Sequence, residues 1–313
     1  MADRMRTDPD MDLPALRDMM DELQAQSAEP TAVTYEEAEI VGRPALWCDP
    51  LDSATDRVIL YLHGGAFVAN SKDTHRKVAA HLAKATGCRA LVIDYRLAPE
   101  NPFPAQLDDA VAAYRRLLRD GVEPGHIAVA GDSGGGGLAT TTVLKLRDDG
   151  DTLPAGIVAI SPWYDMEAKG ETFDTNAAHD AFTTRRTTLA LAAMFLGENG
   201  SATDPLANPL YADATGLPPI YLTCGGYEAL RADAERFARL AADAGVDVTL
   251  EVSEGMQHIY PLMAGRAPEA DRTIANIARW LRPQLGLDAA PVLSAATGPS
   301  AQSGLGTERG SSS

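Results

Sequence analysis

Short apolar runs rich in β-branched residues alternate along the chain with stretches of helical character, and this order constrains the fold more than any other feature. We interpret the apolar runs as strands at 58–63, 89–95, 126–131, 155–161, 219–224 and 246–252. The helical stretches lie at about 72–86, 103–119, 136–148, 229–244 and 269–285. Nearly continuous apolar strands suit a sheet that is covered on both faces. The order therefore predicts an α/β fold in which helices flank a mostly parallel central sheet.

Two segments interrupt this alternation. Within 11–25 the apolar residues recur at intervals of three and four, as on one face of a helix. An insertion at about 165–215, with a helix expected at 185–197, is long enough to form a lid over a binding site, although simple packing on the core is the alternative.

The tail at 289–313 is polar and rich in Gly, Ser and Pro, which predicts disorder. The remaining 1–288 has the length of a single large domain.

Charge and cysteine content narrow the class of protein. The chain has 44 acidic and 27 basic residues and a net charge of −17, which would repel nucleic acid and anionic membrane surfaces, so we expect neither as a partner. The three cysteines are odd in number and show no C-x-x-C spacing, so they predict neither a disulfide framework nor a zinc site. The charged N-terminus lacks an apolar export segment, and we expect a cytoplasmic protein.

A glycine-rich turn, GDSGGGG at 131–137, follows one of the expected strands. A phosphate-binding P-loop would need a lysine and a hydroxyl after Gly136, where Gly137 and Leu138 stand. The dinucleotide-binding motif usually opens the first strand–helix unit, whereas two strands precede this turn. The remaining interpretation, besides an ordinary turn, is G-x-S-x-G, in which glycines relieve crowding around a serine raised clear of the sheet. Ser133 is therefore the candidate nucleophile.

A nucleophilic serine needs a base, and in hydrolases of this type the histidine follows the serine in chain order. His258 lies after the strand at 246–252 and before the final helix, which makes it the candidate base. His179 falls in the insertion and is expected to be solvated or to line a pocket. His63 precedes the serine, and we interpret it as a residue that shapes its own loop.

The acid that orients the histidine is expected after the strand at 219–224. Glu228 stands at the end of that loop, and Asp233 lies further inside the following helix. Position favours Glu228, although the helix dipole alone also favours a carboxylate in a first turn. For the oxyanion we expect backbone N–H groups of Gly134 and of a glycine-rich loop after an early strand, at Gly64, Gly65 and Ala66.

Taken together, these motifs resemble those of the hormone-sensitive-lipase-like esterases of the α/β-hydrolase fold. The sequence HGGA at 63–66 resembles their HGGG motif, 131–135 matches their GDSAG-type turn, and DYRLAPE at 94–100 is also similar. The resemblance spans roughly 35–285. The chain departs from the pattern in two places: Ala66 replaces the third glycine, and Glu228 stands where the family usually has an aspartate.

The resemblance implies a helical cap formed by about 1–35 and 165–215. It places Phe67, Trp163 and apolar residues of 189–196 within reach of substrate, and we count Asp132, beside the nucleophile, with these expected substrate contacts.

The expected activity is that of a serine carboxylesterase for short-acyl or compact esters, using a Ser-His-Glu triad and an acyl-enzyme with no cofactor and no metal. Lactone or amide hydrolysis and acyl transfer would use the same residues, so they stay open, as does a homodimer. A non-catalytic ligand-binding protein on the same fold is the rival hypothesis, since plant hormone receptors that resemble this family have lost the catalytic histidine. The retained His258 argues against it.

Overall fold

The structure is a computed structural model that describes residues 12–288. The expected disordered tail at 289–313 and the first residues of the expected cap, 1–11, lie outside the described residues.

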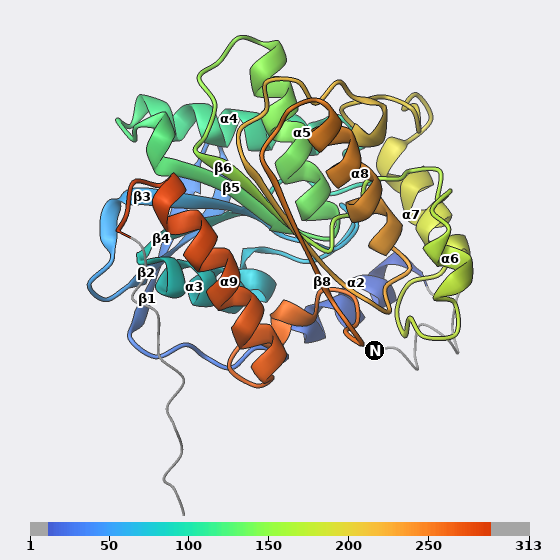
Figure 1. Cartoon of the computed structure of the whole chain (residues 1–313), viewed down its shortest axis with the longest axis horizontal. Coiled ribbons are helices and arrows are strands. Elements are labelled where there is room, and N and C mark those ends of the chain that lie inside the picture. Colours follow the sequence, from blue (N-terminus) through green and yellow to red (C-terminus); the bar gives the residue numbers. More distant parts are fainter. Residues whose placement is uncertain (1–11, 289–313) are drawn as a thin grey trace, which may run out of the picture.

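A mostly parallel sheet forms the centre of the molecule (Figure 1). Its strand order is β1-β2-β4-β3-β5-β6-β7-β8. The bounds are β1 Val33–Ile40, β2 Arg43–Pro50, β3 Ala54–Leu62, β4 Cys88–Ile93, β5 Ile127–Asp132, β6 Gly156–Ile160, β7 Ile220–Gly225 and β8 Val248–Ser253. All pairs from β4 to β8 are parallel, whereas β1–β2 and β2–β4 are antiparallel. The α/β architecture with a mostly parallel central sheet, expected from the sequence, is present in the structure.

Helices cover both faces of the sheet (Figure 1). On one face lie α3 Lys72–Thr86 and α9 Pro268–Gln284; on the other lie α4 Ala105–Arg119, α5 Gly134–Asp148 and α8 Arg231–Asp243. In β3, Leu60 and Leu62 pack into the core under α4 and α5, whereas Ile59 and Tyr61 pack toward α3 and α9. This alternation follows from the two-residue period of a strand, and it explains why β3 to β7 are apolar on both sides.

The structure contains a hairpin of β1 and β2 that the sequence analysis did not predict. Ile40 pairs with Arg43 across a two-residue turn in which Val41 and Gly42 have φ values of 50° and 75°. Positive φ at both positions is the geometry of the tight turns that match strand twist. β1 lies at the edge of the sheet with most of its side chains partly or fully exposed, so polar residues are tolerated there and no apolar run marks it.

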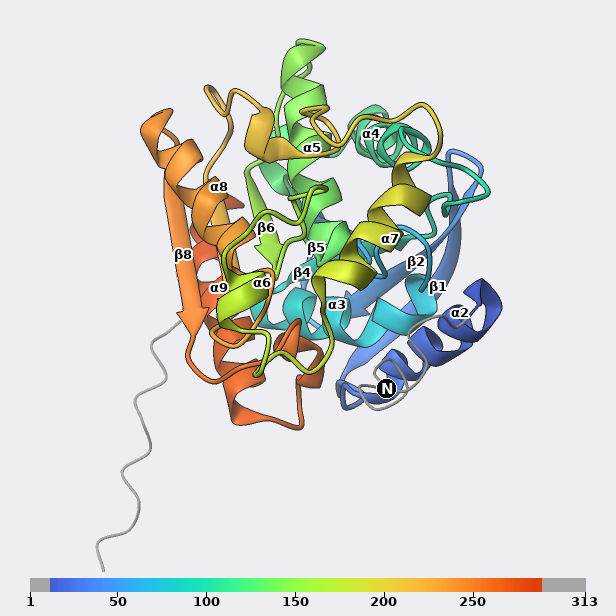
Figure 2. The same cartoon turned by 90° about the vertical axis from the view of Figure 1, so that its right-hand side faces the viewer.

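Segments of the two expected cap regions lie beyond the ends of the central strands. They contain α2 Leu13–Asp21 with a 3-10 turn at Glu22–Ala25, α6 Thr172–Thr175 and α7 Arg185–Leu196. Both views place α6 and α7 on one side of the molecule (Figures 1 and 2). α2 is fastened by Arg17, whose Nε donates to the carbonyl of Val68 at 2.7 Å and whose guanidinium pairs with Glu100. None of the helices within 12–288 combines the length and apolar composition that crossing a bilayer requires.

The turn between β5 and α5 packs its backbone directly against the carboxyl end of β3. A Cβ atom added to Gly135 would lie 2.1 Å from the carbonyl oxygen of Leu62 and 2.5 Å from that of His63. A Cβ on Gly131 would lie 2.6 Å from the Leu62 oxygen. Glycine is therefore required at both positions, because any side chain would push the turn away from β3.

We expect Gly135→Ala to lower the free energy of unfolding by about 3 kcal/mol, since its methyl group meets backbone that cannot rotate away. Gly125→Ala is the matched control, because a Cβ there has no neighbour within 4 Å and its φ is not in the left-handed region. Urea unfolding of both variants measures the difference. Equal stability of the two variants would contradict the close packing described for this turn.

Candidate active site

The candidate nucleophile sits at a strained position at the end of β5. Ser133 has φ 52° and ψ −123°, a backbone conformation that residues other than glycine rarely adopt. Its N–H donates to the carbonyl of Ile160 on the neighbouring β6 at 2.9 Å, and its own carbonyl accepts from the N–H of Trp163 at 3.0 Å. These bonds hold the turn so that the Ser133 side chain points into a pocket.

Three side chains far apart in the sequence form one hydrogen-bonded chain. The Oγ of Ser133 lies 2.9 Å from Nε2 of His258, and Nδ1 of His258 lies 2.9 Å from Oε2 of Glu228. Glu228 follows β7 and His258 follows β8, so adjacent parallel strands bring their carboxyl ends to the same edge. A carboxylate only accepts, so Nδ1 carries the proton, and Nε2 of the neutral ring accepts from the serine hydroxyl. The structure thus brings together the nucleophile, base and acid candidates.

Glu228 is fully buried and its second oxygen is also engaged. Oε1 accepts from the hydroxyl of Ser161 at 2.5 Å and from the N–H of Gly225. The Ser161 hydroxyl in turn accepts from the N–H of Ile259, next to His258, at 3.1 Å. Ser161 therefore ties the acid to the histidine loop, a role that sequence reasoning missed. The available signal was its position directly after the strand β6, beside the strand that leads to Glu228.

Charged groups near the pocket raise the pKa of His258. Burial of the ring lowers its pKa, but the hydrogen bond and the charge of Glu228 act in the opposite direction and prevail. Asp180 and Asp132 add smaller contributions of the same sign. The pKa of His258 is consequently raised from its ordinary value of about 6.5.

The glycine-rich loop after β3 lies beside the serine, but not all of its amides are free. Gly65 and Ala66 line the pocket with Ser133, and Gly134 is so close that a Cβ on it would lie 3.2 Å from the Cα of Ala66. Gly64, by contrast, donates its N–H to Asp132 at 3.1 Å. The expectation that Gly64 supplies an oxyanion donor is therefore wrong, and Gly65, Ala66 and Gly134 remain as candidates.

Asp132 is also not a substrate contact, because its side chain is fully buried behind the loop. Oδ1 accepts from the Tyr61 hydroxyl at 2.9 Å and from Gly64, and Oδ2 lies 3.2 Å from Nε2 of His75. Burial alone would raise the pKa of Asp132, but His75 and the Tyr61 hydroxyl lower it overall. Asp132 therefore holds the glycine-rich loop in place as an anion.

His63 behaves as a structural residue of the same loop. Its ring is buried, stacks on Tyr95 with centroids 4.2 Å apart, and places Nδ1 2.8 Å from the carbonyl of Gly64. Burial, helped by the neighbouring His75, lowers the pKa of His63 to about 3, so the ring is neutral at physiological pH. A neutral, packed ring fits the interpretation that His63 shapes its loop.

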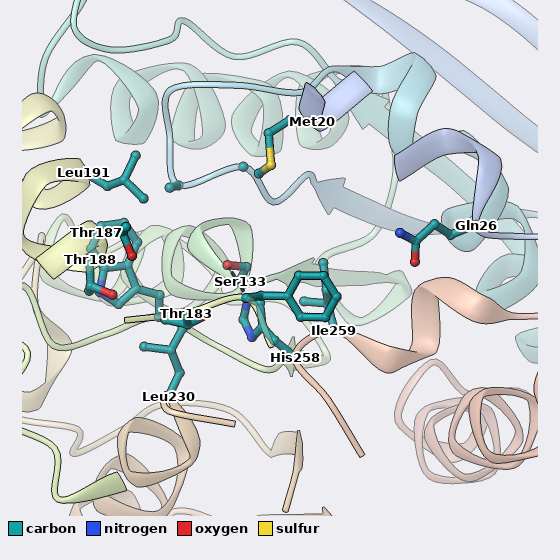
Figure 3. Close-up of a pocket in the computed structure, with 14 residues that line it drawn as sticks. Met20, Gln26, Ser133, Thr183, Thr187, Thr188, Leu191, Leu230, His258 and Ile259 are labelled. Carbon is teal, nitrogen blue, oxygen red and sulfur yellow. Dashed lines mark hydrogen bonds between the residues drawn. The ribbon is translucent and has the colours of Figure 1, made fainter. Parts of the chain in front are cut away.

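The pocket around Ser133 is mainly apolar and encloses about 790 Å³ including its open mouth. Figure 3 shows Ser133 and His258 between Leu191 and Thr187 on one side and Gln26 on the other. The lining residues outside the hydrogen-bonded chain include Met20, Gln26, Trp163, Phe182, Thr183, Thr187, Thr188, Leu191, Leu230 and Ile259. Both expected cap segments therefore contribute to its walls.

Two expected substrate contacts have different positions. Trp163 lines the pocket, as expected. Phe67 lies behind the wall: it is 2% exposed and stacks on Phe195, with ring centroids 3.8 Å apart. The expectation of direct contact is wrong for Phe67, which instead supports the wall through Trp163, whose ring centroid is 5.9 Å away.

The remaining candidates lie away from the hydrogen-bonded chain. His179 is exposed and stacks on Tyr227. Asp233 is fully buried, and its Oδ2 accepts the N–H groups of Tyr164 and Asp165 at 2.9 and 2.8 Å. Burial raises the pKa of Asp233 to about 7. Among residues 12–288, no cluster of three or more His, Cys, Asp or Glu side chains could hold a metal ion.

Comparison with known families agrees with this architecture. A family model described as the alpha/beta hydrolase fold matches residues 59–262, which is more than half of the chain. The chain belongs to this α/β-hydrolase family. An acetyl-hydrolase of Streptomyces hygroscopicus is 40% identical over 233 residues, which are 74% of this chain and 77% of the relative. A putative acetyl-hydrolase of Mycobacterium tuberculosis is 34% identical over 263 residues, which are 84% of this chain and 85% of that relative.

Solved structures give the same assignment. An esterase from the bacterial hormone-sensitive lipase family superposes with a TM-score of 0.85 at 44% identity, over 88% of this chain and 93% of that one. An esterase crystal that was soaked with p-nitrophenyl butyrate superposes with a TM-score of 0.85 at 34% identity, over 88% of this chain and 92% of that one. The resemblance to hormone-sensitive-lipase-like esterases is confirmed.

Proposed function

We propose that the protein is a serine carboxylesterase for short-acyl or otherwise compact esters. The observation that carries the proposal is the chain of hydrogen bonds from the Ser133 hydroxyl through His258 to the buried Glu228, opening into an apolar pocket. A serine hydroxyl is a weak nucleophile until a base accepts its proton, and the base works best when a carboxylate fixes its tautomer. Relatives named as esterases and acetyl-hydrolases support the same activity.

The reaction would proceed in two steps. Oγ of Ser133 attacks the ester carbonyl while Nε2 of His258 takes the hydroxyl proton, and Glu228 stabilises the resulting imidazolium. The N–H groups of Gly65, Ala66 and Gly134 would stabilise the oxyanion. The imidazolium then gives its proton to the leaving alcohol. In the second step a water molecule attacks the acyl-enzyme while Nε2 of His258 accepts a proton from the water. The carboxylic acid product leaves as His258 returns this proton to Oγ of Ser133.

The form and charge of the pocket support compact, neutral substrates. Its walls bring Leu191 of α7, Leu230 and Met20 around the serine, which favours a small apolar acyl or alcohol group. The net charge of −17 disfavours anionic esters. The acetyl-hydrolases and the esterase soaked with p-nitrophenyl butyrate point to the same size range.

We also propose that the protein acts in the cytoplasm, with a small-molecule ester as its partner. The three cysteines are free and buried, which fits a reducing compartment.

Ser133→Ala should lower kcat for p-nitrophenyl acetate by about six orders of magnitude, as removal of the nucleophile does in other serine hydrolases. Residual turnover would come from binding and from the oxyanion donors alone. Steady-state assays of purified protein, with the melting temperature as a fold control, measure the effect. A variant that kept most of its activity would rule out Ser133 as the nucleophile.

Glu228→Gln should lower kcat by about four orders of magnitude, because the amide cannot stabilise the imidazolium and favours the wrong tautomer. Asp233→Asn is the matched control: it makes the same carboxyl-to-amide change at another fully buried residue of the same region, one whose Oδ2 accepts from two backbone amides. We expect it to retain most of the activity. If Asp233→Asn were the more damaging of the two changes, the assignment of Glu228 as the acid would fail.

A further inference from the structure

Asp180, in the cap insertion between α6 and α7, makes three hydrogen bonds to backbone amides. Its Oδ1 accepts from the N–H groups of Phe182 and Thr183 at 2.7 and 2.8 Å. Its Oδ2 accepts from the N–H of Ala229 at 2.6 Å. One carboxylate thus joins two segments that are 49 residues apart in the sequence.

The two segments serve different parts of the site. Phe182 and Thr183 line the pocket, whereas Ala229 directly follows Glu228, the proposed acid. An aspartate that only stabilised its own turn would need the two local bonds made by Oδ1. The bond from Oδ2 to Ala229 has no part in that turn, so Asp180 does more than shape its loop.

The histidine loop is fastened to the same cap segment. Gln257, the neighbour of His258, accepts the N–H of Ala181 at Oε1 and donates from Nε2 to the carbonyl of His179, both at 2.9 Å. The residues on either side of Asp180 are therefore bonded to the loop that carries the proposed base.

Asn176, also in the cap insertion, makes two more hydrogen bonds to the acid loop. Asn176 donates from Nδ2 to the carbonyl of Glu228 at 2.8 Å and to that of Gly226 at 3.0 Å. Asp180 thus belongs to a connected set of polar contacts in which the pocket wall, the acid loop and the histidine loop share one cap segment.

The charge of Asp180 also acts on the histidine. The carboxylates whose charges raise the pKa of His258 are Glu228, Asp180 and Asp132. Burial of the ring lowers its pKa, and these carboxylates raise it, so removal of any one charge should move the pKa down.

We propose that Asp180 is a positioning residue that couples the pocket wall of the cap to the acid–base pair. It holds Glu228 in reach of His258 through the amide of Ala229, while its other oxygen fixes the wall at Phe182 and Thr183. A substrate that seats against this wall thereby stabilises the arrangement of Glu228 and His258. This inference rests on the proposed esterase function, within which Asp180 contacts neither substrate nor reacting atoms.

The test compares Asp180→Asn and Asp180→Glu with Asp204→Asn. The asparagine removes the charge and one of the acceptor oxygens; the glutamate keeps the charge but displaces the carboxylate by one methylene. Asp204 lies in the same insertion and caps a turn at the N–H of Leu206, so Asp204→Asn removes an equal charge from a similar contact. Asp204 is not among the charges that raise the pKa of His258.

Two readouts keep the inference separate from the proposed function. NMR titration of ring-labelled histidine gives the pKa of His258 directly, with its signal assigned among the six histidines by loss in a His258→Gln sample. The pH dependence of kcat/KM for p-nitrophenyl acetate gives the kinetic effect. If the unmodified protein hydrolysed no ester, the proposed function would fail, whereas the NMR titration would still test Asp180.

For Asp180→Asn we expect the His258 pKa to fall, because one of the charges that raise it is removed, and kcat/KM to fall about tenfold. Asp180→Glu should keep the pKa close to that of the unmodified protein and still lower kcat/KM. Asp204→Asn should change neither quantity. The proposal is overturned if Asp180→Asn matches Asp204→Asn in the pKa of His258, since a loss of activity alone would follow from a merely structural role.

Discussion

The site depends on one backbone contact, in which the turn after β5 rests against the carbonyl oxygens of Leu62 and His63 at the end of β3. Only glycine at positions 131 and 135 allows the two segments to come so close. The same contact brings Ser133 next to the loop whose amides are the oxyanion candidates. The candidate nucleophile and the candidate oxyanion donors are therefore neighbours because of sheet packing, before any substrate is present.

Buried carboxylates in this protein take different roles because their partners differ. Asp132 faces Tyr61 and His75 and fixes the glycine-rich loop, whereas Asp233 accepts only from backbone amides and has a raised pKa of about 7. Glu228 alone among these three faces His258. A carboxylate hydrogen-bonded to an imidazole can stabilise the imidazolium cation, which is what the proposed mechanism requires.

The sequence predicted the elements whose signals are local and strong. The apolar strands and the chain order of serine, acid and histidine led to Ser133, Glu228 and His258, which the structure brings together. Side-chain direction at the crowded turn could not be predicted: Asp132 adjoins Ser133 in sequence but points away from the pocket. Because Asp132 points this way, it accepts the N–H of Gly64, which is then not available to an oxyanion. The bond from Ser161 to Glu228 could not be predicted, because it forms only when β6 lies beside β7.

The central claim is that Ser133 is activated by a histidine whose pKa is raised, and covalent labelling tests it most directly. A fluorophosphonate would be reacted with the protein across a range of pH, and the adduct followed by intact mass and peptide mapping. Only neutral His258 can accept the serine proton, so the labelling rate should fall as pH drops through a pKa above the ordinary 6.5 of histidine, with Ser133 as the labelled residue. A rate that did not change with pH, or an adduct on another residue, would contradict this account.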